Sequence, residues 1–426
     1  RAGFEGFEIT GSQTWIDGSD GNQMLGLTFG WAGDRSNLLL AFEWDRRSEL
    51  QIRDMDFGLK PFADNFNGGW STTGMPGTTY LRDPSIPVPD GALDGTNQQV
   101  YAGPEPMCEE LGGDIEFGQC SFQFTFFDNM IEETDQYKTY GEFNYDFSDT
   151  TTLHLEGMYS VMDMPAWKSS PAYPPNSLYG PDRIVPVTNP GLIQYKQDYP
   201  ELFANLPAGE TIDSVEVYQR SRMLGVNGRD GEPLEAEFKT TTYRLAAALQ
   251  GEFSGFSYDA AISYSQRKRE TEGFDMQVQG MAFALNGLGG PDCTPGGADP
   301  ATSTPGVGPC MWFNPFSSAI DRSVPAGIDN PNYIPGLAND PELIDWLTLR
   351  GASESTNELL VFDFVVNGMT NISLPGGDIG WAAGLQARNE KFELKLADVS
   401  NVAVNPCPWT NPAAVDFGFT TADQLS

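Results

Sequence analysis

The chain has 426 residues and a net charge of −35, from 24 Lys and Arg against 59 Asp and Glu. Such an acidic surface is a poor partner for nucleic acid, whose phosphates are bound by clustered Lys and Arg. Aromatic residues make up 12% of the sequence, too many for a disordered chain, and no apolar run is long enough for a membrane helix.

The first fifty residues contain three alternating runs. Residues 7–15, 25–31 and 38–44 place their large apolar side chains on one face of an alternating pattern, and a break at 17–22 and a short turn at 33–35 separate the runs. This period of two predicts three β-strands. Each run ends in a Trp, as an aromatic girdle at a membrane interface requires.

Three further hairpins follow, each with a short turn. The turns are expected near 148–150, 251–255 and 370–377. The hairpin at 241–265 is the clearest: Tyr243 and Leu245 fall on one face, and small or polar residues on the other. Strands of this length with one apolar and one polar face are typical of a transmembrane β-barrel. A solvated β-sandwich produces the same alternation, so the repetition of the pattern decides between them.

Long Gly- and Pro-rich connections separate the hairpins, at about 48–135, 163–235 and 271–353. Short turns on one rim and long loops on the other match the asymmetry of membrane barrels. A short helix is expected from Asp340–Pro341 to Arg350, because Asp is a good N-cap and Pro suits the first helical turn. Residues 122–126 are read as an extra loop strand or the upper end of a barrel strand.

Five cysteines are present, which is an odd number. Cys108 lies near Cys120, and Cys293 near Cys310, while Cys407 stands alone. Two local disulfides, with a partner for Cys407 beyond the sequence, predict an oxidised, extracytoplasmic protein. Five free thiols are the alternative.

Several stretches resemble the TonB-dependent outer-membrane receptors of Gram-negative bacteria. They are the strand ending at 42–50 (FEWDRRSEL), the segment 118–120 (GQC), residues 314–316 (NPF) after the second cysteine pair, and 374–390 with its GLQARNE. The resemblance covers most of the strands and is weak in the loops. It identifies the family and not the ligand.

The resemblance implies an antiparallel transmembrane β-barrel of 22 strands, of which residues 1–426 supply about nine, with long structured extracellular loops. It also implies a plug domain before Arg1 and further strands after Ser426, both expected outside this sequence. The implied partners are the inner-membrane TonB complex, through that plug, outer-membrane lipid and lipopolysaccharide, and a small nutrient. The nutrient classes are siderophores, oligosaccharides, vitamins and peptides.

Candidate site residues are few. Loop aromatics can stack on a ligand or simply pack the loops together, and the sequence does not separate these roles: they are Trp70, Trp167, Tyr173, Tyr179, Trp312 and Trp346. No cofactor is expected, except that Asp54, Asp56 and Asp64 are candidates for Ca²⁺ binding in an acidic loop.

The polar face of the predicted strands carries many carboxylates, which we interpret as a hydrated lumen wall and not as individual ligands. They are Glu8, Glu43, Asp45, Glu142, Asp146, Glu156, Asp259 and Asp363. The only His, His154, lacks the neighbours of a metal site or a catalytic base. With no phosphate-binding Gly loop, HExxH or GxSxG present, we expect no enzyme.

The sequence analysis therefore predicts an outer-membrane receptor for TonB-energised nutrient uptake. Two other classes stay open. A passive porin would lack the plug, and a soluble β-rich adhesin would leave membranes on carbonate washing.

Overall fold

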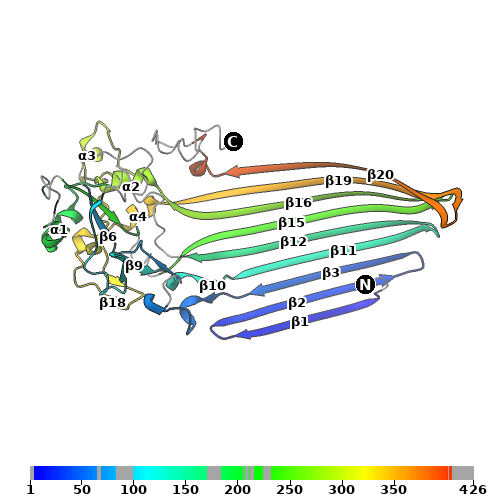
Figure 1. Cartoon of the computed structure of the whole chain (residues 1–426), viewed down its shortest axis with the longest axis horizontal. Helices are drawn as coiled ribbons and strands as arrows, with labels where there is room; N and C mark the ends of the chain where they lie inside the picture. The colour runs from blue at the N-terminus through cyan, green and yellow to red at the C-terminus, as the bar shows by residue number, and fades with distance from the viewer. Residues whose placement is uncertain are drawn as a thin grey trace.

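The computed structural model describes residues 4–64, 69–82, 99–169, 184–204, 206, 211, 215–223, 232–401 and 403–404. Its largest unit is one long antiparallel sheet, and the remaining short elements gather at one end of it (Figure 1). The predicted all-β fold is confirmed. Among the described residues, no helix is long and apolar enough to cross a membrane.

The sheet has nine strands in the order β1-β2-β3-β11-β12-β15-β16-β19-β20, each antiparallel to its neighbours. All nine predicted strands are present: β1 (Gly6–Ile16), β2 (Ser19–Ala32), β3 (Ser36–Arg47), β11 (Thr134–Ser148), β12 (Thr151–Ser169), β15 (Leu234–Phe253), β16 (Phe256–Met276), β19 (Thr348–Leu374) and β20 (Gly377–Leu396). In the described part of the chain, β1 and β20 are the edge strands.

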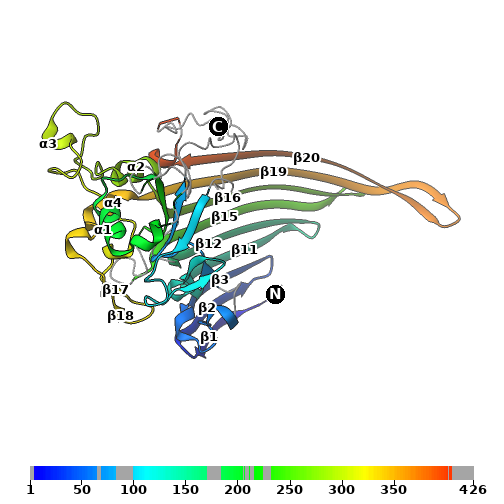
Figure 2. The ribbon, with the colours of Figure 1, turned by 60° about the vertical axis from the view of Figure 1, so that its left-hand side comes forward.

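The two rims of the sheet differ as predicted. Connections of two or three residues, at 33–35, 149–150, 254–255 and 375–376, lie at one rim. The long connections 48–133, 170–233 and 277–347 lie at the other, which we call the loop rim, together with a two-residue turn at 17–18. The β19–β20 hairpin reaches furthest beyond the short-turn rim (Figure 2).

Several predicted boundaries were wrong. The first break covers only residues 17–18, because Ser19–Asn22 already belongs to β2 and Asn22 pairs with Thr14. Strands β12, β15, β16 and β19 all run further toward the loop rim than expected. The predicted helix at 341–350 ends at Leu347, because Thr348 already pairs with Met276 in the sheet.

Side chains alternate between two faces of the sheet, which we name by their composition. The belt face carries Leu27, Phe42, Tyr159 and Tyr243, and the polar face carries the intervening residues. Large apolar side chains on the belt face are widely exposed, including Ile9 at 63% and Leu385 at 64%. The belt face therefore has no protein core over it in the described structure.

The apolar belt crosses the strands at a slant. One register row begins with Leu25, Trp44, Tyr137 and Val161, and continues through Thr241 into Lys268, Thr356 and Glu393. A second row, nearer the short turns, begins at Ser36 and ends in Phe364 and Leu385. The belt thus moves toward the short-turn rim from β3 to β20, as it must when strands tilted by about 35–45° cross a flat membrane.

The described residues of the three long connections fold together into a unit that we call the cap (within 48–133, 170–233 and 277–347). Its strands form small separate sheets, of which the largest has the order β13-β14-β6-β7 and combines the first two connections. The cap strands are β4 (Leu50–Gln51), β5 (Trp70–Ser71), β6 (Thr78–Arg82), β7 (Gln99–Pro104), β8 (Asp114–Glu116), β9 (Gln119–Gln123), β10 (Asn129–Ile131), β13 (Ile184–Val185), β14 (Glu216–Arg220), β17 (Arg322–Ser323) and β18 (Ile328–Asp329). The α-helices are α1 (Pro190–Asp198), α2 (Val278–Leu285), α3 (Pro300–Ser303) and α4 (Pro341–Leu347), each with Pro or an apolar residue in its first position.

The cap has a hydrophobic core of its own. Buried side chains from all three connections meet in it, including Leu81, Leu192 and Leu343. A second, smaller cluster joins Met75, Leu111 and Ile320 from the first and third connections. The predicted extra strand at 122–126 is present only as far as Gln123, where β9 gives way to a 3-10 helix at Phe124–Phe127.

Candidate functional site: the polar face and the cap

The predicted lumen carboxylates all fall on the polar face by register, and several of them belong to two clusters, one across β3 and β11 and the other across β11, β12 and β15. Lys138 lies between Glu43, at 2.7 Å, and Asp45, at 3.1 Å. Further along, Arg244 pairs with Glu156. These carboxylates are therefore members of charge-paired clusters, as expected for a polar wall.

His154 belongs to the cluster that contains Glu156. Its Nδ1 lies 2.7 Å from Asn144 Oδ1, and its Nε2 lies 3.7 Å from Glu156. Asn144 in turn donates to Glu142 at 2.8 Å. In the described part of the chain, no group of three or more His, Cys, Asp or Glu side chains is placed to hold a metal ion. The arrangement is a hydrogen-bonded surface and does not assemble a nucleophile with a base.

The polar face changes character near the loop rim. On β16 it presents Arg267 and Arg269, both exposed. Arg269 lies over the ring of Phe238, 5.9 Å from the ring centre, and Phe238 meets Trp167 edge-to-face at 5.6 Å. This end of the face is therefore cationic and aromatic, in contrast to the carboxylates of β3, β11 and β12.

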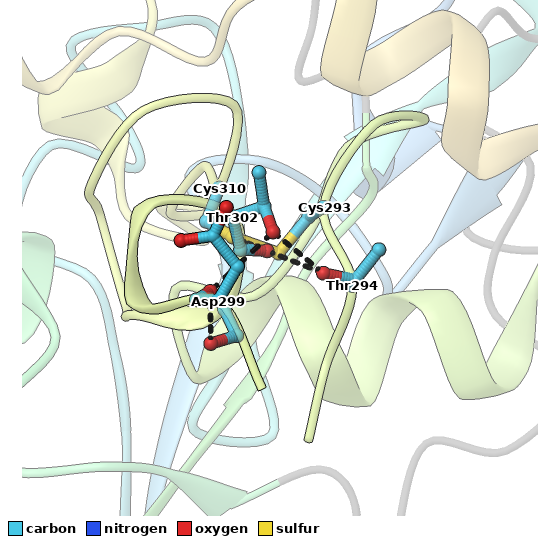
Figure 3. The surroundings of a disulfide bond; sticks show 6 residues. Cys293, Thr294, Asp299, Thr302 and Cys310 are labelled. Atoms are coloured by element: carbon cyan, nitrogen blue, oxygen red, sulfur yellow. Dashed lines mark hydrogen bonds between the residues drawn. A yellow bond between two sulfur atoms is a disulfide. The ribbon is translucent and has the colours of Figure 1, made fainter. Parts of the chain in front are cut away.

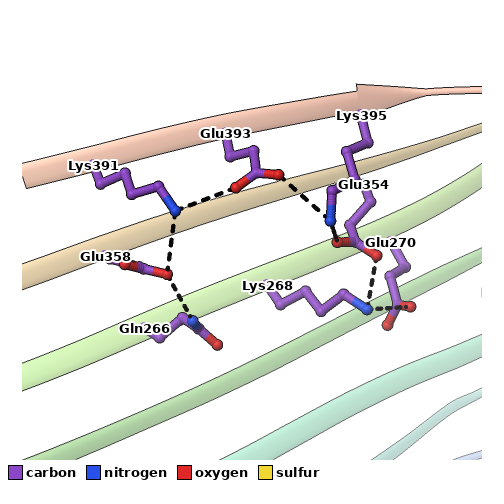
Figure 4. Close-up of polar contacts among 8 residues, drawn as sticks. All are labelled: Gln266, Lys268, Glu270, Glu354, Glu358, Lys391, Glu393 and Lys395. Carbon is purple, nitrogen blue, oxygen red and sulfur yellow. Dashed lines mark hydrogen bonds and ion pairs between the residues drawn. The ribbon is translucent and has the colours of Figure 1, made fainter.

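The belt face is also polar near the loop rim, but in a different way. Three lysines and four glutamates alternate across β16, β19 and β20 (Figure 4). Lys268 lies 2.8 Å from both Glu270 and Glu354, and Lys395 lies 3.2 Å from Glu354. Each ammonium group is shared between two carboxylates, so this surface is a network of ion pairs that is suited to water instead of lipid tails.

Glu105 ties the three connections of the cap together. Its carboxylate accepts hydrogen bonds from Gly77 N (3.2 Å), from Gln219 Nε2 (3.1 Å) and from Ser317 N (2.6 Å), one partner from each connection. The side chain is fully buried. Burial raises the pKa of Glu105 from 4.5 to about 7, although its hydrogen bonds from Ser317, Gly77 and Gln219 oppose the shift.

Two other buried polar side chains link the connections. Asn189 caps α1 by accepting from Gly191 N at 2.9 Å, and donates to the carbonyls of Leu285 and Phe313 at 3.0 Å each. Arg222 donates to Thr73 O at 2.6 Å and lies over the rings of Phe122 and Phe124. Burial lowers the pKa of Arg222 to about 10, because the charged form is disfavoured away from solvent, although the charge of Asp128 opposes the shift.

Both predicted disulfides are present, at Cys108–Cys120 and Cys293–Cys310. The second closes a segment that includes α3 (Figure 3). Asp299 caps this helix by accepting from Ala301 N at 3.0 Å, and Thr294 N donates to Thr302 O at 2.7 Å. Loops of 12 and 17 residues closed in this way lose entropy in the unfolded chain, worth about 3 kcal/mol each. Cys407 lies outside the described residues.

The predicted ligand aromatics have different surroundings. Trp70 donates to Lys60 O and packs against Phe62, while Trp312 packs against the backbone at Gly287 and Gly306. Trp346 lies partly buried against the cap core. Trp167, 43% exposed, is the most exposed of these four. Tyr173 and Tyr179 lie outside the described residues.

Asp54, Asp56 and Asp64 all lie in described parts of the cap, but they do not form a group of the size that holds a metal ion. Ca²⁺ binding there stays a prediction.

Sequence reasoning missed Glu105, Arg222 and the two neighbouring arginines of β16, Arg267 and Arg269. One available signal was overlooked: Asn189–Pro190 and Asp299–Pro300 have the same cap-then-Pro pattern that identified the helix at Asp340–Pro341. Nothing in the residues around Glu105, between Pro104 and Pro106, indicates three distant partners.

No protein-family model matches the sequence, and no curated protein matches it. Among solved structures, the chain is similar to the Escherichia coli outer membrane transporter YddB, at 7% identity and TM-score 0.25, over 88% of this chain and 32% of that one. It is also similar to the Pseudomonas aeruginosa ferric enterobactin receptor PfeA (9%, TM-score 0.25, 91% and 37%) and to the E. coli ferric-catecholate import receptor Fiu (10%, TM-score 0.22, 92% and 51%). The chain spans about a third to a half of the length of these proteins. Similarities of this low identity and TM-score do not support an inference about function.

Proposed function

We propose that the chain forms part of the wall and the extracellular cap of an outer-membrane receptor that takes up a nutrient by a TonB-energised mechanism. The slanted apolar belt supports this proposal most directly. An exposed row of large apolar side chains is costly in water, at about 25 cal/mol for each Å² of apolar surface, and is stable against lipid tails.

The rest of the architecture fits the same proposal. The polar face would line the lumen, and the cap would stand outside the cell, where its disulfides persist. A cap with its own core and a rim of polar side chains is a surface on which a specific ligand can be recognised before import. The chain would then need the plug and the inner-membrane energy source that the family resemblance implies.

The first test is location. The full-length protein expressed in a Gram-negative host should fractionate with the outer membrane and resist extraction by sodium carbonate. Release into the soluble fraction would overturn the membrane assignment and favour an adhesin.

The second test separates active from passive transport. Purified full-length protein in a planar bilayer should show no steady conductance, because a plug would close the lumen. Growth of a strain that depends on this protein for iron, vitamin or oligosaccharide uptake should stop when a protonophore removes the energy source. An open, ohmic channel and protonophore-resistant uptake would indicate a porin instead.

A further inference from the structure

Arg267 and Arg269 lie two residues apart on the polar face of β16, and both side chains are exposed. Among the described residues, neither forms an ion pair, whereas Arg244 on the same face pairs with Glu156. Lys268, between them in sequence but on the opposite face, contacts two glutamates at 2.8 Å. The two exposed guanidinium groups therefore lie next to each other with no described carboxylate paired to either of them.

Their neighbours on the polar face are uncharged. By register, Arg269 lies between Thr240 and Ser355, and Arg267 between Thr242 and Asn357. These hydroxyl and amide groups add hydrogen-bond donors without adding negative charge. The surface is therefore locally positive, and a planar guanidinium is the group best matched to a carboxylate or phosphate.

Aromatic and aliphatic side chains flank the two arginines. On one side, the edge-to-face pair of Trp167 and Phe238 leads to Arg269. On the other side, the same two register rows continue to Leu394 and Phe392 on β20, which are 52% and 64% exposed. Exposed rings beside a cation offer a stacking surface for a planar group.

We propose that this part of the polar face, made by Arg267, Arg269, Trp167, Phe238 and Phe392, binds a small anionic ligand that carries a planar ring. The arginines hold the anion, and the rings hold the planar part. The proposal rests on the proposed function only in placing this face inside a lumen, where a nutrient would meet it below the cap. It names the class of nutrient that the receptor would admit.

The test uses phenyl phosphate as the probe, because it joins one anion to one ring. Inorganic phosphate and benzyl alcohol each carry one of the two features. Titration of the purified full-length protein, followed by calorimetry, should show that phenyl phosphate binds more tightly than either. No detectable binding of phenyl phosphate to the unaltered protein would overturn the proposal.

Variants assign the two features to residues. Arg267→Gln/Arg269→Gln should weaken phenyl phosphate about tenfold or more, since charge-assisted hydrogen bonds are lost. Trp167→Ala should weaken phenyl phosphate and leave inorganic phosphate unchanged. Lys268→Gln is the matched control: it removes a positive charge from the same strand on the opposite face, and binding should not change.

Equal losses in Lys268→Gln and the arginine variant would show general charge attraction and overturn the site. Circular dichroism and heat-dependent gel migration check that each variant folds. If the double Gln variant does not fold, Arg267→Lys/Arg269→Lys keeps the charge but loses the planar fork, and weaker binding is again expected. The binding assay needs no transport, so it fails or succeeds independently of the location and uptake tests.

Discussion

The sheet and the cap differ in how far their apolar side chains are buried. Among the described residues, the largest side chains with less than 2% exposure all belong to the cap, including Phe316, Leu81 and Leu343. On the sheet, by contrast, Leu385 and Ile262 remain half exposed or more. The cap is stabilised like a soluble domain, while the sheet depends on something outside the described structure to cover its belt.

This difference explains why the two regions have different amino-acid patterns. A sheet with one face in lipid, as proposed here, needs an apolar residue at every second position and no specific long-range partners. A cap made from three distant connections needs specific long-range partners, such as those of Glu105 and Asn189. The following predictions use single substitutions to separate the two kinds of stability.

The largest effect is expected from Leu343→Ala, at the centre of the cap core, where the side chain is fully buried. Truncation of a buried Leu costs about 2–5 kcal/mol, through lost burial and the cavity left behind. Hydrogen exchange should show faster opening of β6, β14 and α1, with the central strands of the sheet unchanged. Equal loss of protection in the sheet would show that cap and sheet unfold as one unit.

The second prediction concerns the belt. Ile262→Arg places a charge on the belt face, between Ala247 and Phe362 in register. It should destabilise the folded protein in lipid vesicles by about 2–4 kcal/mol. Ser263→Arg, the next residue on the polar face, should have a much smaller effect. Urea unfolding in vesicles measures both, and equal costs would contradict the assignment of faces.

The third prediction is a pH dependence confined to the cap. The folded-state pKa of Glu105 is raised from 4.5 to about 7, so the folded cap binds the proton more tightly than the unfolded chain. Stability from this group is present below pH 4.5 and is lost as the pH rises through about 7, by about 3 kcal/mol in all. Exchange rates of the cap, corrected for intrinsic pH effects, should show this loss.

Glu105→Gln provides the control for that measurement. It should abolish the pH dependence, because Gln does not titrate. It should also cost about 1–3 kcal/mol above pH 7, where the native group is ionised, since its NH₂ group faces N–H donors where the carboxylate accepted from them. An unchanged pH profile in the variant would mean that another group is responsible.

The smallest effect is expected at a turn. Phe117, 90% exposed, has φ of 51° in the two-residue turn between β8 and β9, and Ser254 has φ of 54° in the turn between β15 and β16. Asn tolerates this conformation better than Phe, so Phe117→Asn should stabilise the cap by up to about 1 kcal/mol. Thermal melting measures the gain, and a loss would show that the exposed Phe117 ring makes contacts in solution.

The fold of the sheet could be predicted from sequence because the belt is a local, repeated signal. Alternation around Tyr243 and Leu245 gave the strands, and the turn residues between hairpins gave their order. The ends of the strands could not be predicted. Beyond the belt, β16 carries Lys268 on one face and Arg269 on the other, so apolar and polar positions no longer alternate. The backbone hydrogen bonds between the strands nevertheless continue.

The candidate site was only partly predictable. The aromatic residue Trp167 and the cysteine pairs were identified from sequence, since each is recognisable alone. The unpaired state of Arg267 and Arg269 depends on which strands lie beside β16 and on the register of each. The pattern within one segment does not reveal which strands become its neighbours or in which register they pair. For the same reason it does not reveal the partners of Glu105, which come from three connections.

The most direct test of the slanted belt compares two positions in one register row. Trp44 on β3 and Glu393 on β20 are joined by this row across the sheet. A nitroxide label would be placed at each position in turn, in the full-length protein reconstituted into lipid. Collision rates with oxygen, which concentrates in lipid, and with a water-soluble nickel complex should identify Trp44 as lipid-facing and Glu393 as water-facing. The same environment at both positions would contradict the account, because the row would then run parallel to the membrane.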